Sequence, residues 1–263
     1  MKPVFLKEIR LNIKNLLIWS LSVGIIGIIC ILLYKSMQGD VKEMADAFSN
    51  MGAFSDAFGM STLSIATLAG YFATEVGTVH GLGGGMFAAI LAINILSKEE
   101  EGHTGEFLFA LPVSRSKVVA AKGICVLIML VLFTLICGLF YVCGFVALGE
   151  EIPGKELFIF MLMQLIMNIE IAAVCFAISS ISGKNRMGLG LGITLLFYVY
   201  DLMGRVVPDA KEYLFVGPYA YANASEIFSN AETPVKALVT GAVVAVVAAV
   251  SAFFIYNKRD LAS

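Results

Sequence analysis

Long stretches without charge alternate with short polar segments along this 263-residue chain. Six of these stretches have about the 20 residues that an α-helix needs to cross a bilayer. We place the spans at residues 15–34, 75–97, 121–148, 157–182, 187–207 and 234–256. Residues 61–73 are apolar too, so the second span either begins earlier or follows a short helix outside the membrane. The pattern predicts an all-α integral membrane protein with six transmembrane helices.

Residues 2–14 precede the first span and have the pattern of an amphipathic helix. Phe5, Ile9 and Ile13 repeat at a spacing of four. Basic side chains lie largely on the other faces: Lys2, Lys7, Arg10 and Lys14. This pattern favours an N-terminal helix that lies in the membrane interface. The alternative is a charged flank that only orients the first span.

Two polar segments contain apolar side chains of their own. The segment between spans one and two has an apolar stripe: Met44, Phe48, Met51, Phe54 and Phe58. Residues 208–233, before the last span, contain aromatic side chains around Gly217-Pro218: Tyr213, Phe215, Tyr219, Tyr221 and Phe228. Aromatic side chains prefer the membrane–water interface. We therefore expect short interfacial or re-entrant helices in both segments.

Composition agrees with this pattern and gives the chain an orientation. Apolar residues make up 59% and charged residues 14% of the chain, unlike a soluble domain. The net charge of −2 provides no basic surface for nucleic acid. Of the 18 lysines and arginines, 12 lie on the side that holds both termini and 6 on the other. Both termini are therefore predicted to be cytoplasmic, because basic residues favour that side.

Motifs for catalysis are missing from the sequence. Gly183-Lys184 superficially suggests a phosphate-binding loop, but Ile178 stands where its first glycine belongs and Asn185 replaces Ser or Thr. The two histidines, His80 and His103, lie in no HExxH motif, and no GxSxG motif occurs. The five cysteines form no CxxC pair, which favours a packing role over metal binding. We expect no catalytic residue, cofactor or metal in this chain.

Three polar residues lie near the middle of the fourth predicted span: Gln164, Asn168 and Glu170. A carboxyl group in hydrocarbon is costly and normally faces protein or water. Glu170 and its two neighbours either line a substrate path, or Glu170 is a hydrogen-bonded carboxyl that holds helices together. The sequence does not choose between these readings.

Other polar residues in the spans have simpler interpretations. Asp201 and Arg205 are four residues apart on one helix face, so we expect a neutralised ion pair. Glu75 and His80 are predicted to be interfacial. Small residues recur at helix-packing spacing in spans two, five and six: Gly81-x3-Gly85-x3-Ala89, Gly188-x3-Gly192 and Gly241-x3-Ala245-x3-Ala249.

The loop at residues 98–122, between spans two and three, is the most informative segment. Glu99, Glu100 and Glu101 open it, and Thr104 is suited to cap a short helix. That helix would carry Glu106 in its first turn, and Pro112 would end it. Its apolar side chains are Phe107, Leu108, Phe109 and Leu111. Such a helix suits docking into a groove of a cytoplasmic partner; the alternative is a loop held by lipid headgroups.

This loop resembles that of the permease subunits of ABC-2 type ATP-binding cassette transporters. They commonly carry an acidic residue, a glycine and an LLALPVSR…K run after their second helix. The matching residues here are Glu101, Gly102, Glu106, Leu108, Ala110, Leu111, Pro112, Val113, Ser114, Arg115 and Lys122. The resemblance extends over the whole chain as a single permease domain, residues 1–263. It includes the amphipathic segment 2–14, the six spans and the outer segment 208–233.

The resemblance implies a multi-pass subunit of a bacterial-type cytoplasmic membrane. Two permease subunits, here identical copies, would pair with two separate ATP-binding subunits that hold ATP and Mg²⁺. The loop would be the coupling helix. Its apolar side chains would contact the ATPase, while acidic and basic residues would fix the register: Glu99, Glu100, Glu101, Glu106 and Arg115.

The cargo and two other functional classes stay open at this stage. Apolar spans with few polar groups suit an amphipathic or hydrophobic substrate, with a peptide or peptide toxin as the first candidate and a drug as the second. The first alternative is a secondary transporter or ion-conducting protein that uses Glu170 and Asp201. The second is a membrane immunity or scaffold protein that transports nothing.

Overall fold

The computed structural model describes residues 2–37, 39–40, 43, 45, 47, 51–105, 113–229 and 234–259. In these residues it is all-helical, and six helical segments are long and apolar enough to cross a membrane. They are α1 (Lys2–Ser36), residues 68–93, α8 (Arg115–Leu148), α9 (Gly154–Ile181), α10 (Met187–Val206) and α12 (Val235–Lys258). The predicted fold class and number of spans are confirmed.

The second span is not a uniform α-helix. It begins with α4 (Leu68–Tyr71), continues through a π-helical turn, η1 (Phe72–Val76), and ends with α5 (Gly77–Ile93). The Thr67 side chain caps α4 by accepting a hydrogen bond from the Gly70 backbone N–H at 3.0 Å. The first of the two sequence alternatives is therefore correct, because the span begins several residues before residue 75.

Short helices lie between the spans. They are α3 (Ala53–Ala57), α6 (Lys98–Glu101), the 3-10 helix η2 (Pro208–Val216) and α11 (Ala224–Phe228). η2 begins with a proline, whose fixed φ suits a first helical turn. Asn223 caps α11 by accepting a hydrogen bond from the Glu226 backbone N–H at 3.1 Å. The expectation of short helices around residues 53–58 and 208–228 is confirmed. Met44 and Phe48 lie outside the described residues.

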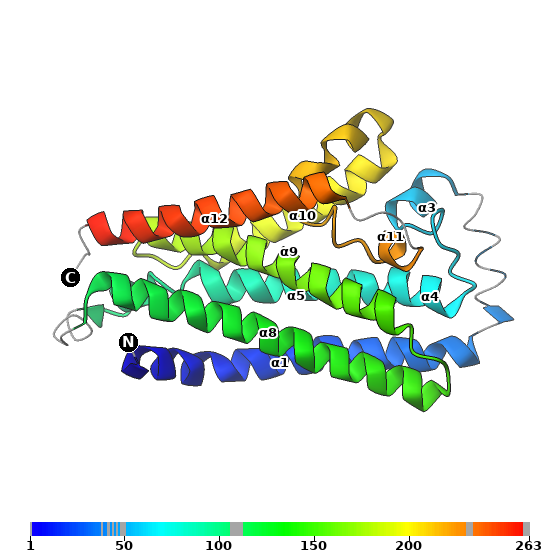
Figure 1. Ribbon diagram of the computed structural model, residues 1–263, viewed down its shortest axis with the longest axis horizontal. Coiled ribbons are helices and arrows are strands. Elements are labelled where there is room, and N and C mark those ends of the chain that lie inside the picture. The colour runs from blue at the N-terminus through cyan, green and yellow to red at the C-terminus, as the bar shows by residue number, and fades with distance from the viewer. Residues whose placement is uncertain are drawn as a thin grey trace.

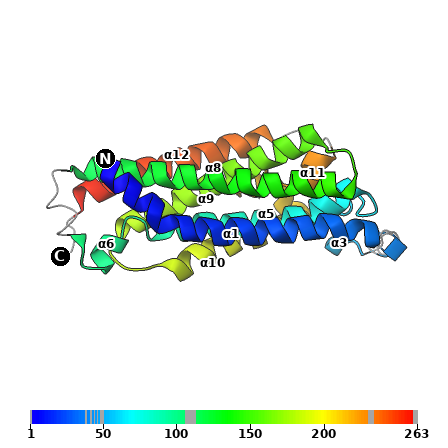
Figure 2. The same ribbon diagram turned by 90° about the horizontal axis from the view of Figure 1, so that it is seen from below.

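The N-terminal segment differs from its prediction in one respect. Residues 2–14 are helical, as expected, but α1 continues from Lys2 to Ser36 without a break. At 1.5 Å per residue it is about 50 Å long, more than the roughly 30 Å of a hydrocarbon core. Figure 2 shows its first turns inclined to the rest, so that Val4 packs against Val118 and Ala121 of α8. The amphipathic segment is therefore a continuation of the first span, and its apolar face packs on α8.

The helices run side by side as a bundle, with α1 along α8 and α9 along both α5 and α12 (Figure 1). Glycines allow close contact between α1 and α8, since a Cβ at Gly144 would lie 3.0 Å from Ile31. The most hydrophobic stretch of the second span is 61% buried within the chain, whereas that of α12 is 11% buried. The second span is therefore central, and α12 is peripheral.

The bundle has two ends of different composition. Both termini and α6 lie at one end, which we call the α6 end (Figures 1 and 2). The helices α3, α4 and α11 lie at the other, the α11 end. There the fully buried ring of Phe72 packs against the rings of Tyr141, Phe145, Phe160 and Phe228, at centroid distances of 5.1–5.8 Å. This aromatic core joins the second span to α8, α9 and α11.

Candidate functional site: the α6 end

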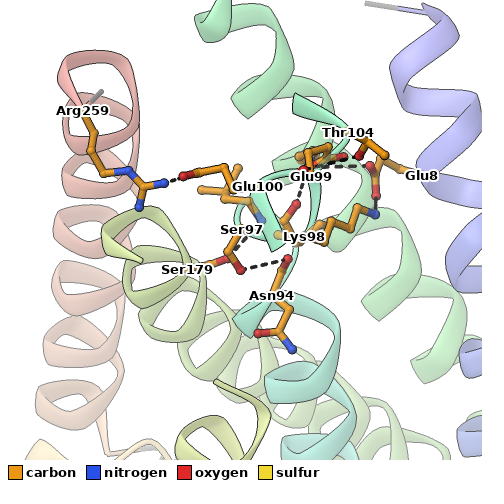
Figure 3. Close-up of polar contacts among 12 residues, drawn as sticks. Glu8, Asn94, Ser97, Lys98, Glu99, Glu100, Thr104, Ser179 and Arg259 are labelled. Atoms are coloured by element: carbon orange, nitrogen blue, oxygen red, sulfur yellow. Dashed lines mark hydrogen bonds and ion pairs between the residues drawn. The ribbon is translucent and has the colours of Figure 1, made fainter. Parts of the chain in front are cut away.

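The turn that carries α6 is attached to the bundle through its backbone. Leu96 N–H donates to Ser179 Oγ of α9 at 2.9 Å (Figure 3). After the single turn of α6, Thr104 N–H donates to the Glu99 carbonyl at 2.8 Å. His103 lies between α6 and Thr104, and its positive φ of 50° makes the backbone turn there. The start of the predicted coupling loop is therefore a tight turn against α9.

Four charged side chains form a cluster beside this turn, and all but Lys98 are buried. Glu8 of α1 pairs with Lys98 of α6 through one carboxylate oxygen. Its other oxygen lies 3.8 Å from the Lys122 ammonium of α8. Lys122 is completely buried and also pairs with Glu99 and donates to the Ile95 carbonyl. The cluster thus joins α1, α6 and α8.

A second set of contacts joins α6 to α9 and the end of α12. The Arg259 guanidinium, just after α12, pairs with Glu100 (Figure 3) and donates to the Ser180 carbonyl at 3.1 Å. Arg115 at the start of α8 donates to the Arg259 carbonyl at 2.6 Å. A Cβ at Gly183 would lie 2.7 Å from the Glu100 carboxylate, so a larger residue here would displace that side chain. Here α8, α9 and α12 meet α6.

These contacts hold α6 and its neighbouring helices together. A buried charge that loses its partner costs several kcal/mol, so displacing α6 alone would break its ion pairs at high cost. Displacing α6 together with α1, α8 and the end of α12 would keep these ion pairs. This arrangement can couple a movement at the loop to the membrane helices.

The predicted loop residues fall into three groups. Glu99 and Glu100 are buried in the ion pairs just described, whereas Glu101 is exposed. Arg115 is partly buried, and Ser114 occupies the N-cap position of α8, although its side chain makes no capping hydrogen bond. The remaining predicted residues lie outside the described residues: Glu106, Phe107, Leu108, Phe109, Leu111 and Pro112.

Two residues of the cluster were missed by sequence reasoning. Glu8 was not singled out, although it lies one turn after Val4 and therefore on the buried face of α1. Lys122 was identified only as a match to the family's motif, and its burial was not predicted. It lies four residues after Val118 and four before Val126, both buried, and this spacing was a signal for burial on the same face.

The predicted substrate-path residues do not form one group. Gln164 and Asn168 face the glycines of α5: a Cβ at Gly81 would lie 3.6 Å from Gln164. Glu170 points elsewhere, toward α12 and the outer segment, where it accepts a hydrogen bond from the Tyr221 hydroxyl at 2.7 Å. Gly241 of α12 packs directly against its carboxyl group. The position of Glu170 matches a carboxyl that holds helices together.

The Asp201–Arg205 ion pair is confirmed at the α11 end. Arg205 Nε and Nη2 donate to the two Asp201 oxygens at 2.8 and 3.0 Å. Glu226 of α11 lies 3.8 Å from the same guanidinium. Burial raises the pKa of the Glu226 carboxyl above its ordinary value, and the Arg205 charge opposes this increase. The three side chains connect α10 to α11.

The interfacial prediction is wrong for His80. Its side chain is completely buried, and its Nδ1 lies 2.8 Å from the Tyr141 hydroxyl. The rings of Phe133 and Phe160 are within 5.6 Å of the imidazole. Glu75, by contrast, is exposed at the α11 end. The two residues are five apart and so face different directions on the helix.

Small-residue motifs and cysteines complete the picture. The glycines of spans two and six pack against neighbouring helices as predicted, but a Cβ at Gly188 or Gly192 would meet nothing within 4 Å. All five cysteines are free thiols. Within the described residues no group of three or more His, Cys, Asp or Glu side chains could hold a metal ion.

Comparison with known proteins identifies one related family. The family model described as ABC-2 family transporter protein matches residues 3–261, which is nearly the whole chain. No curated protein matches the chain in sequence.

Proposed function

The chain belongs to the ABC-2 transporter family, and we propose that it is the membrane subunit of an ATP-driven exporter. The ATPase would be a separate chain that holds ATP and Mg²⁺, because this sequence lacks a phosphate-binding loop. Two copies of the permease would assemble with two ATPase subunits in a bacterial-type cytoplasmic membrane. The α6 end would face the cytoplasm, as the 12-to-6 distribution of basic residues favours.

The observation that carries this proposal is the attachment of α6 to the membrane helices. Ion pairs from this one turn reach α1, α8 and the end of α12. An ATPase that binds the loop differently in its two nucleotide states would move these helices together. A loop that only rested on lipid headgroups would not need buried charges linking it to three helices.

The ATPase contact itself is proposed for the part of the loop that follows Glu99 and Glu100 in the sequence. Glu101 is exposed and free of the ion pairs made by Glu99 and Glu100. Phe107, Leu108, Phe109 and Leu111 supply apolar groups that a groove of the partner would bury. In this division of roles, Glu99 and Glu100 anchor the loop and residues 101–111 engage the motor.

The substrate class is proposed from the chemistry of the spans. Their polar groups are few, and Glu170 and the Asp201–Arg205 pair are satisfied within the chain. An amphipathic or hydrophobic molecule, first a peptide or peptide toxin and second a drug, is the cargo that such spans suit.

The test is a double substitution in the complete transporter, Phe107→Ala with Phe109→Ala. We expect the purified permease to keep its thermal unfolding temperature, because these residues are proposed to face the partner. Co-purification of the ATPase subunit and ATP-dependent export should both be lost. Phe158→Ala, at an exposed position of α9, is the matched control and should leave both unchanged.

Full export with normal coupling in the double variant would contradict the proposal. Export that continues without any ATPase subunit would instead favour a secondary transporter, in which Glu170 or Asp201 carries an ion. Loss of ATPase association without loss of permease stability is the result that separates the exporter from both alternatives.

A further inference from the structure

Glu75 differs from Asp201 and Glu170, two other acidic residues within the spans. Asp201 is paired with Arg205, and Glu170 accepts a hydrogen bond from Tyr221. Among the described residues, Glu75 has neither an ion-pair partner nor a hydrogen bond. It lies in η1, the π-helical turn of the second span, and its side chain is exposed at the α11 end. A carboxylate without a partner of its own can attract a cation.

A pocket of about 410 Å³ is lined in part by Glu75. It lies between the end of α1, the segment around α3 and the first turns of the second span. Its walls include the aromatic rings of Phe54, Phe58 and Tyr71 and the thioether of Met60. Pockets of about 300–1,000 Å³ with apolar walls and a few polar groups are typical small-molecule sites. We call it the Glu75 pocket.

A buried hydroxyl in the pocket wall also lacks a partner. The side chains of Thr134, Thr194 and Thr240 each donate to the carbonyl four residues earlier in their helices. Thr74, in the π-helical turn, makes no such bond, and its buried Oγ1 has no hydrogen-bond partner among the described residues. π-helical turns within α-helices frequently occur at functional sites. Thr74 therefore leaves a second polar group without a partner in the pocket wall, next to Glu75 in the sequence.

We infer that the Glu75 pocket binds a hydrophobic organic cation. The carboxylate would neutralise the positive charge, and the three rings would contact the organic body through apolar and cation–π interactions. Anions of the same shape would be excluded, because they would face Glu75 without compensation. The inference deepens the proposed function by giving the substrate a charge. Binding, however, requires only the permease.

The experiment measures binding to the purified permease in lipid nanodiscs, without an ATPase. The probe is tetraphenylphosphonium, and tetraphenylborate is its anionic counterpart of nearly the same shape. We expect saturable binding of the cation, above that of empty nanodiscs, and none of the anion. Glu75→Gln should weaken cation binding at least tenfold, and Phe58→Ala should weaken it several-fold.

Glu151→Gln is the matched control, since it removes an exposed carboxylate between α8 and α9 that lies outside the pocket. It should bind the cation as the unmodified chain does. Equal binding of cation and anion, or unchanged cation affinity in a folded Glu75→Gln variant, would overturn the inference. Cation binding by a permease that never associates with an ATPase would uphold this site and refute the exporter.

Discussion

The two ends of the bundle use charged side chains in different ways. At the α6 end, ion pairs connect different elements: Glu8 to Lys98, Lys122 to Glu99 and Glu100 to Arg259. At the α11 end, the closest ion pair, Asp201–Arg205, lies within a single helix. Pairs between elements resist relative movement of those elements, whereas a pair within one helix does not. The α6 end is thus held together mainly by charged pairs between elements, and the α11 end mainly by aromatic packing.

The largest expected effect comes from breaking the α6-end cluster with Lys122→Met. The substitution leaves the buried carboxylates of Glu8 and Glu99 without this cation, which should cost about 3–5 kcal/mol of folding free energy. The measurement is chemical unfolding of the purified protein in detergent, together with its yield. Lys117→Met, on the exposed face of the same helix, should change stability little. Equal stability of the two variants would show that the cluster does not hold α1, α6 and α8 together.

The corresponding change at the α11 end is Arg205→Met. The substitution leaves Asp201 without its cation. Because Glu226 is partly exposed, water can reach this region, and we expect a smaller loss of folding free energy, about 2–3 kcal/mol. Lys211→Met, in exposed η2, is the control. The same unfolding measurement applies. A loss larger than that of Lys122→Met would reverse the proposed ranking of the two ends.

The smallest expected effect is a pH dependence at Glu226. Its folded-state pKa is raised above the ordinary value of 4.5 by burial. Protonation therefore favours the folded state: this contribution is fully present below pH 4.5 and is lost as pH rises through the folded pKa. The unfolding temperature of the unmodified chain should fall, relative to Glu226→Gln, as pH increases above 4.5. Parallel pH profiles for the two proteins would contradict the assignment.

The sequence was sufficient for the spans because their ends are marked locally. The third span ends before Gly149, which adopts φ 80°, and Pro153 directly precedes the fourth. The Asp201–Arg205 pair was predictable for a similar reason, since its spacing of four places both side chains on one helix face. Local spacing settles such contacts without knowledge of the fold.

Contacts between distant segments were not predictable in this way. Glu170 has its partner Tyr221 in the outer segment, and Glu8 has Lys98. The burial of Lys122 was not predictable either, because a lysine near a span end normally reaches water. Only the packing of α1 and α6 on α8 buries it. Fold class thus followed from composition and periodicity, whereas the candidate site depended on which helices meet.

The π-helical turn in the second span changes the directions in which the two parts of this span face. A π-turn accommodates one residue more than an α-helical turn, and one residue corresponds to a rotation of about 100°. The insertion therefore changes the phase of the helix between Glu75 and the glycines at 81, 84 and 85. Upstream, the helix presents its acid to the Glu75 pocket; downstream, its glycines meet α9 and α10. Because of this one extra residue, the same span can face the Glu75 pocket with its first part and contact α9 and α10 with its second part. A regular α-helix would turn these residues in other directions.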